Sequence, residues 1–224
     1  MSISPEDLDQ LMAARYSCRG FKSDAVPRDV IDNILRTAQR VPSWCNAQPW
    51  ELVITSGAET EAFRKALRAE VETGAPKPDL PFPSSYSGVY KERRSTCGWA
   101  LYEAVGVEKG DRAGSAAQMM RNFDLFDAPH CAILSSPAEL GPYGALDVGG
   151  FVTAFTLAAQ AQDVATIPQA AVASYSPFLH QYFSIPEDRL ILCAISFGYA
   201  DPDHPANSFR TERADLDTFT TWKG

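Results

Sequence analysis

One helical segment constrains the fold of this 224-residue chain more than any other part of the sequence. Residues 144–162 read GALDVGGFVTAFTLAAQAQ, and around Phe151 the pattern is apolar on nearly every side. A helix without a polar face has to be buried inside a domain or against another subunit. Its longest apolar stretch, FVTAFTLAAQAQ (151–162), is too short and too polar to span a bilayer. We therefore predict one domain, residues 1–224, that buries this helix.

Helical and strand patterns interleave along the rest of the chain. Ser4, Pro5 and Asp7 have the pattern of a capped helix start. Further helices are expected from Pro27 to before Pro42, over about 57–73, and over about 87–126 in two pieces, the second capped by Asp111. The expected strands are ELVITS (51–56), PHCAILSS (129–136) and a long central strand, RLILCAISFGY (189–199). By itself, such interleaving favours a parallel α/β sheet.

The charge and cysteine content exclude several classes of function. A formal net charge of −8, with no Lys/Arg run of five or more, argues against a general nucleic-acid partner. The five cysteines are odd in number and widely spaced, which is typical of reduced thiols in a cytoplasm. The three histidines lie far apart without paired cysteines, so no metal site is expected. The acidic, polar start MSISPEDLDQL does not look like an export signal, and no membrane association is expected.

The first segment with unusual chemistry is RYSCRGF. Arg15 and Arg19 are four residues apart near a helix end, so both guanidinium groups can converge on one anion such as a phosphate. Ser17 adds a hydroxyl or a backbone N–H between them. A solvated salt-bridge surface is the alternative interpretation of the two arginines.

The second segment is PSWCNAQPW, a turn bounded by prolines. Ser43, Asn46 and Gln48 place hydroxyl and amide groups beside Trp44 and Trp50. Mixed donors and acceptors on a stiff turn suit a flat heterocycle with an alternating polar edge, such as an isoalloxazine. As turn chemistry alone, the same residues would be unremarkable.

The third segment is the tail HPANSFRTERADLDTF, in which Arg210 and Arg213 can supply further phosphate contacts or form a solvated terminus. Competing chemistries lack their usual patterns: there is no G-x-G-x-x-G after a strand, no G-x-x-x-x-G-K-[ST] and no G-x-S-x-G. Cys45 is a candidate nucleophile, although most free cysteines behave as small hydrophobic residues.

Four motifs in order resemble the FMN-dependent nitroreductase family along nearly the whole chain, most closely members that reduce nitrobenzoates and other nitroaromatic compounds. They are R-x-S-x-R-x-F (15–21), P-S-x-x-N-x-Q-P-W (42–50), T-x-P-Q-A (166–170) and S-F-G-Y (196–199) before an arginine-bearing tail. The resemblance implies an α+β fold with a mixed, mainly antiparallel sheet flanked by helices, in an intertwined homodimer. It also implies that residues 75–130 line the substrate site and that residues 200–224 reach the partner subunit.

The resemblance further implies which residues bind FMN. Arg15 and Arg19 would hold its phosphate and pyrimidine edge with help from Ser17, and Arg213 or Arg210 would complete the phosphate site. Ser43, Trp44 and Asn46 would approach from the partner subunit. The segment 168–171 would pass near flavin N5. The full set is Arg15, Tyr16, Ser17, Arg19, Pro42, Ser43, Trp44, Asn46, Gln48, Pro168, Gln169, Ala170, Ala171, Arg210 and Arg213. Tyr16 stands where many members carry a second arginine or a histidine, and Thr211 where many carry Arg or Lys.

The implied activity is a ping-pong, two-electron transfer through flavin N5 from NADH or NADPH to a small aromatic acceptor. No acid–base residue of the chain is expected to be catalytic, because solvent can supply the protons. Candidate contacts to the acceptor are Trp44, Tyr90, Arg93, Arg94 and Phe123, with Tyr86, Trp99, Tyr102 and Phe126 as further aromatic candidates. The alternative for the aromatic residues of the middle segment is a place in the core or the dimer interface, and for the two arginines a solvated helix face. The alternatives are another acceptor (a quinone, an activated alkene or reductive dehalogenation) and a non-catalytic FMN-binding module.

Overall fold

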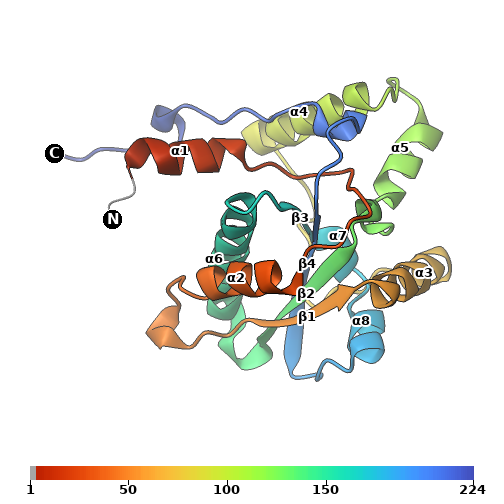
Figure 1. Cartoon of the computed structure of the whole chain (residues 1–224). Helices are drawn as coiled ribbons and strands as arrows, with labels where there is room; N and C mark the ends of the chain where they lie inside the picture. Colours follow the sequence, from red (N-terminus) through yellow and green to blue (C-terminus); the bar gives the residue numbers. More distant parts are fainter. Residues whose placement is uncertain (1–3) are drawn as a thin grey trace.

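The computed structural model describes residues 4–224, and every strand of its central sheet runs antiparallel to its neighbours. The strands are β1 (Glu51–Ser56), β2 (His130–Pro137), β3 (Ala165–Gln169) and β4 (Arg189–Gly198), in the order β1-β2-β4-β3 (Figure 1). The parallel sheet favoured by interleaving alone is therefore wrong, and the mainly antiparallel sheet expected from the resemblance is confirmed. An isolated parallel bridge between Ser17 and Thr166 attaches the N-terminal segment to edge strand β3.

Helices cover both faces of the sheet (Figure 1). The longer helices are α1 (Pro5–Ala14), α2 (Arg28–Ala38), α3 (Ala58–Thr73), α4 (Gly88–Ala104), α5 (Arg112–Met120), α6 (Gly141–Gln160) and α8 (Ser176–Phe183), and α7 (Ala170–Ala173) is a single turn. Side chains of β2 alternate between the faces, as the pleat of a strand requires. Ala132 and Leu134 pack with α2 and α6, whereas Cys131 and Ile133 pack with α3, α7 and α8.

The apolar helix α6 is buried over its C-terminal half. Phe151 and Phe155 in that half, and Val148 just before it, are almost fully covered and pack between α2 and the sheet. This confirms the prediction of a buried helix for that half. Tyr143 and Leu146, in the N-terminal half, are exposed in the single chain.

The predicted helix starts are also confirmed. Ser4 Oγ accepts a hydrogen bond from the N–H of Asp7, and the Asp7 carboxylate accepts one from the N–H of Ser4. The Asp111 carboxylate accepts one from the N–H of Gly114 at the start of α5. These three bonds satisfy N–H groups that would otherwise be unpaired at the start of a helix.

Helix α1 and the C-terminal tail lie on one side of the molecule, apart from the sheet (Figure 1). Helix α1 buries none of its residues, and Leu8 and Met12 are exposed. In the tail, Leu216, Phe219 and Trp222 are 71%, 70% and 90% exposed. Both segments thus present apolar side chains that the single chain leaves uncovered.

Over residues 4–224, no helix has the length and apolar character needed to cross a bilayer. Within the same range, no group of three or more His, Cys, Asp or Glu side chains is arranged to hold a metal ion.

Candidate functional site

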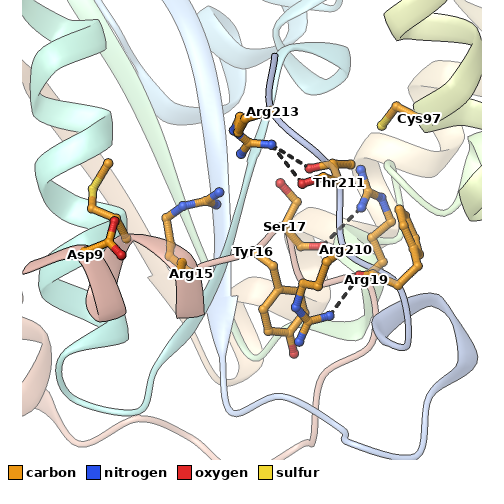
Figure 2. Close-up of a pocket in the computed structure, with 12 residues that line it drawn as sticks. Asp9, Arg15, Tyr16, Ser17, Arg19, Cys97, Arg210, Thr211 and Arg213 are labelled. Atoms are coloured by element: carbon orange, nitrogen blue, oxygen red, sulfur yellow. Dashed lines mark hydrogen bonds between the residues drawn. The ribbon is translucent and has the colours of Figure 1, made fainter. Parts of the chain in front are cut away.

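A cavity of about 570 Å³ lies where the N-terminal segment meets the C-terminal tail. Its walls are the last turns of α1, residues 15–19, the side of α4 at Cys97 and residues 209–213 of the tail (Figure 2). The segments are far apart in sequence, and they meet because the chain after β4 returns across residues 19–21. The backbone N–H of Asp201 donates to the Gly20 carbonyl, and Phe21 bridges to Ala200.

Four arginines line this cavity: Arg15, Arg19, Arg210 and Arg213. Among the described residues, none of the four lies within ion-pair distance of a carboxylate. Burial lowers the pKa of Arg15, and the positive charge of Arg213 lowers it further. Burial also lowers the pKa of Arg19. Arginine stays protonated despite such shifts. Asp9 lines the same cavity (Figure 2), so its four arginines leave an excess of positive charge that an anion would stabilise.

The side chains of Arg213 and Arg210 are oriented differently, which indicates different roles for them in the cavity. Arg213 lies close enough to Arg15 to lower its pKa, and its Nη1 is held by the Thr211 carbonyl and hydroxyl (Figure 2). The guanidinium of Arg210 instead stacks on the Tyr16 ring, 3.8 Å from its centroid, and donates to the Asn207 carbonyl. This geometry favours Arg15 and Arg213 as anion contacts, with Arg210 and Tyr16 forming the adjacent wall.

A residue that sequence reasoning missed, Asn207, fastens the tail to the arginine segment. Its Oδ1 accepts from the N–H of Arg19 at 2.8 Å. Its Nδ2 donates to the carbonyls of Gly20 at 2.9 Å and Asp201 at 2.8 Å. Close packing of the tail supports the same contact, because a Cβ on Gly20 would overlap the His204 ring. The motif P-A-N-S looks like an ordinary turn, and only the burial of the amide reveals its role.

The second predicted segment, 42–50, does not line the arginine cavity of the same chain. Pro42, Trp44, Asn46 and Gln48 are exposed, and Ser43 is partly exposed. Short helix η1 (Trp44–Asn46) interrupts the loop. The structure thus presents these groups to solvent on a single chain, and their approach from a partner subunit stays a prediction.

The segment 168–171, expected near flavin N5, spans the end of β3 and the start of α7. Gln169 is buried, where its Nε2 donates to the Asn122 carbonyl and its Oε1 accepts from Ser196. Its side chain is therefore committed to the core, and a ligand can reach only neighbouring groups. Pro168 and Ala170 are exposed and Ala171 is partly exposed.

The candidate acceptor contacts divide between α4 and the core. Tyr90, Arg93 and Arg94 are exposed on α4, and the Arg94 guanidinium lies 5.3 Å from the Tyr86 ring centroid. Trp99 and Tyr102 form an edge-to-face pair on the same helix. Phe123 and Phe126, in contrast, are 4% and 2% exposed. The chain after α5 turns inward toward β2 and takes both rings into the core, so neither is a surface contact in this chain.

A sequence model of the nitroreductase family matches residues 12–199. The chain belongs to the nitroreductase family. The match includes Arg15, Ser17 and Arg19 and ends before Arg210 and Arg213.

Relatives of this nitroreductase-family chain match it over almost its full length. The 4-nitrobenzoate reductase of Pseudomonas putida is 29% identical over 224 residues, which cover 100% of this chain and 99% of that protein. A 4-nitrobenzoate reductase of Nocardioides sp. (strain LMS-CY) is 30% identical over 97% of this chain and 90% of that protein. The structure of the FMN-dependent nitroreductase NfnB from Mycobacterium smegmatis, in complex with NADPH, has a TM-score of 0.92. It is 29% identical and covers 97% of this chain and 98% of that one.

Within this nitroreductase-family chain, the donor set of the cavity fits a phosphorylated, planar cofactor. Guanidinium groups match the geometry of a phosphate and can bind it through two parallel hydrogen bonds. Ser17 and the aromatic ring of Tyr16 line the same cavity and complement a polar-edged ring system. The cations and the adjoining polar and aromatic surface are thus present in one place.

Proposed function

We propose that this chain is an FMN-dependent NAD(P)H oxidoreductase that reduces nitroaromatic compounds. The observation that carries the proposal is the cavity at the end of α1, where four arginines meet without a carboxylate partner among the described residues. The 4-nitrobenzoate reductases and the FMN-dependent NfnB, which match nearly the whole chain, support the same activity.

In this proposal the chain's own groups bind and orient the cofactor. Arg15 and Arg213 hold the phosphate, and Arg19 with Ser17 contacts the pyrimidine edge. Arg210, stacked on Tyr16, closes the cavity beside them. When bound, FMN supplies the site that accepts a hydride from NADH or NADPH and passes two electrons to the acceptor. Arg19 is partly buried and keeps a fixed positive charge at the edge of the site, which favours an electron-rich ligand.

A second group of cofactor contacts comes, in this proposal, from a second copy of the chain. We assign Pro42, Ser43, Trp44, Asn46 and Gln48 to the partner's side of the site, because they lie outside the arginine cavity of their own chain. The exposed apolar side chains of α1 and of residues 200–224 support a homodimer in which both segments are covered. Light scattering tests this directly: a persistent, active monomer at micromolar concentration would contradict the two-chain site.

The acceptor site is assigned to the 75–130 segment, and specifically to α4. Cys97 lines the arginine cavity, and Arg93 and Arg94 precede it by four and three residues, which places them on the same side of the helix. Arg94, packed over Tyr86, is our candidate for pairing a carboxylate on the acceptor, as a nitrobenzoate carries. The five unpaired thiols support a reducing, cytoplasmic location.

Spectroscopy of the purified holoprotein tests the activity. We expect a yellow protein whose flavin absorbance bleaches with NADH or NADPH under anaerobic conditions and recovers when 4-nitrobenzoate is added. Arg15→Ala should lose bound FMN, whereas the control Arg28→Ala, which removes an arginine that is 84% exposed on α2, should retain it. A colourless protein that does not take up added FMN would refute the proposal, and bound flavin that neither nicotinamide bleaches would indicate a binding module.

A further inference from the structure

The 42–50 loop contains three residues in a backbone conformation that L-amino acids rarely adopt. The φ angles of Cys45, Asn46 and Gln48 are 49°, 58° and 49°, and none of these residues is glycine. Such conformations are costly and persist only where surrounding contacts enforce them. The loop therefore depends on the groups that hold it.

Contacts within the loop close it on itself. Ser43 Oγ accepts from the N–H of Gln48 at 2.9 Å, and the Ser43 carbonyl accepts from the N–H of Asn46 at 3.0 Å. These bonds define the shape of the turn. They do not determine where the turn lies on the rest of the molecule.

The C-terminal end of the loop is fixed to the sheet. Arg189, a buried residue at the start of β4, donates from Nη2 to the Pro49 carbonyl at 3.0 Å. The Trp50 ring stacks on Phe151, with 5.1 Å between the ring centroids. This end is therefore anchored by buried groups of the domain.

The N-terminal end is held from α6 by a different kind of contact. The N–H of Trp44 faces the Asp147 carboxylate, 3.2 Å from Oδ1 and 3.1 Å from Oδ2. Tyr143, four residues before Asp147 on the helix, packs on the indole with 4.7 Å between centroids. Among the described residues Asp147 makes no ion pair, so its carboxylate is available to the backbone N–H.

We propose that Asp147 is a positioning residue that holds Trp44 and Asn46 in the geometry needed to contact FMN. The inference rests on the proposed function, in which the 42–50 loop supplies one side of the cofactor site. The carboxylate accepts a hydrogen bond from the backbone N–H of Trp44, and it thereby fixes the N-terminal end of the loop. Without this acceptor, the contact of Trp44 with Tyr143 has to hold the N-terminal end, and the strained residues Cys45, Asn46 and Gln48 sample other conformations.

Titration of the apoprotein with FMN, followed by quenching of flavin fluorescence at one protein concentration, tests this role. We expect Asp147→Ala to weaken FMN binding about tenfold, the effect of losing one charge-assisted hydrogen bond. Asp147→Asn keeps a carbonyl oxygen at the same position and should bind within about threefold of wild type. Asp32→Ala is the matched control, because Asp32 is a partly exposed aspartate on α2 whose carboxylate pairs with Arg28 and not with the N–H of Trp44.

Two further measurements separate positioning from folding. The urea midpoint of the apoprotein should match wild type for Asp147→Asn and differ little for Asp147→Ala, since Asp147 is not buried. If Asp147→Ala does not fold, Asp147→Glu decides the question: it keeps the charge but displaces the acceptor, so FMN binding should still weaken.

The outcomes are distinct. Wild-type affinity in both Asp147→Ala and Asp147→Glu would overturn the positioning role alone. A loss in Asp147→Asn as large as in Asp147→Ala would show that the charge, and not the acceptor oxygen, is what matters, and would also overturn it. A wild-type apoprotein that does not bind FMN would overturn the proposed function, and this inference with it.

Discussion

The amide of Asn207 offers the sharpest test of how the site is assembled. It is 6% exposed and joins three backbone groups: it accepts from the N–H of Arg19 and donates to the carbonyls of Gly20 and Asp201. In Asn207→Ala all three bonds are lost, and the groups that remain lie in a place that water reaches poorly. In Asn207→Asp the shape is kept and the bond to Arg19 survives, but a carboxylate oxygen faces two carbonyl oxygens.

A net contribution of about 1 kcal/mol per hydrogen bond predicts that Asn207→Ala lowers the free energy of unfolding by about 3 kcal/mol. Asn207→Asp should be at least as unstable at neutral pH, because a buried carboxylate without donors for its second oxygen is costly. Both variants should also bind FMN more weakly, since the Arg19 backbone and the tail are no longer fastened together.

Urea unfolding of the apoprotein at one protein concentration measures the first effect, and flavin fluorescence measures the second. Asn33→Ala is the control, because Asn33 is exposed on α2 and accepts a single bond from Arg36, so its loss should change stability by at most about 0.5 kcal/mol. Wild-type stability in Asn207→Ala would refute the fastening role. Wild-type stability in Asn207→Asp alone would show that the two bonds donated to the Gly20 and Asp201 carbonyls contribute little to stability.

Three further predictions follow from other contacts. Gly20→Ala should cost about 1–3 kcal/mol of stability and weaken FMN binding, because the added methyl group overlaps the His204 ring; unchanged melting and affinity would contradict the packing of the tail. Burial alone lowers the pKa of His180, but the Ile185 carbonyl and the Asp79 carboxylate face its two ring nitrogens and raise the pKa above 6.5 overall. The stability from this pair should therefore be complete below about pH 6.5 and decline as pH rises through the raised pKa, with a smaller decline in Asp79→Asn; urea midpoints across this range measure it. Arg94→Ala should raise the KM for 4-nitrobenzoate and leave that for nitrobenzene nearly unchanged, and equal effects on both acceptors would exclude a carboxylate contact.

Local sequence patterns were sufficient for most of the helices and three of the strands. Caps such as Ser4 and Asp111 act within three residues, so they are visible in the sequence. Strand β3 was not predicted, because it has five residues and includes Pro168, a residue that disfavours strands. Sheet direction could not be derived from periodicity either, because it depends on pairings such as that of β2 with β4, which lie far apart in the chain.

Some residues of the candidate site could likewise be predicted from the local sequence, and others could not. Arg15, Ser17 and Arg19 lie within five residues of each other, so their convergence could be predicted from spacing. Asn207 could not be identified, because its partners lie up to 188 residues away. The burial of Phe123 and Phe126 was also hidden, since an aromatic residue in the sequence does not indicate which side of the fold it will occupy.

The strained backbone at Cys45 has a consequence for protein engineering. Glycine adopts positive φ at no steric cost, so Cys45→Gly should stabilise the fold by about 1 kcal/mol without removing a proposed cofactor contact. The same change at Asn46 or Gln48 would relieve similar strain but delete an amide assigned to the cofactor. A selection for thermal stability alone would favour glycine at all three positions, whereas a selection for turnover would accept it only at Cys45. In this loop, greater stability would therefore come at the expense of activity.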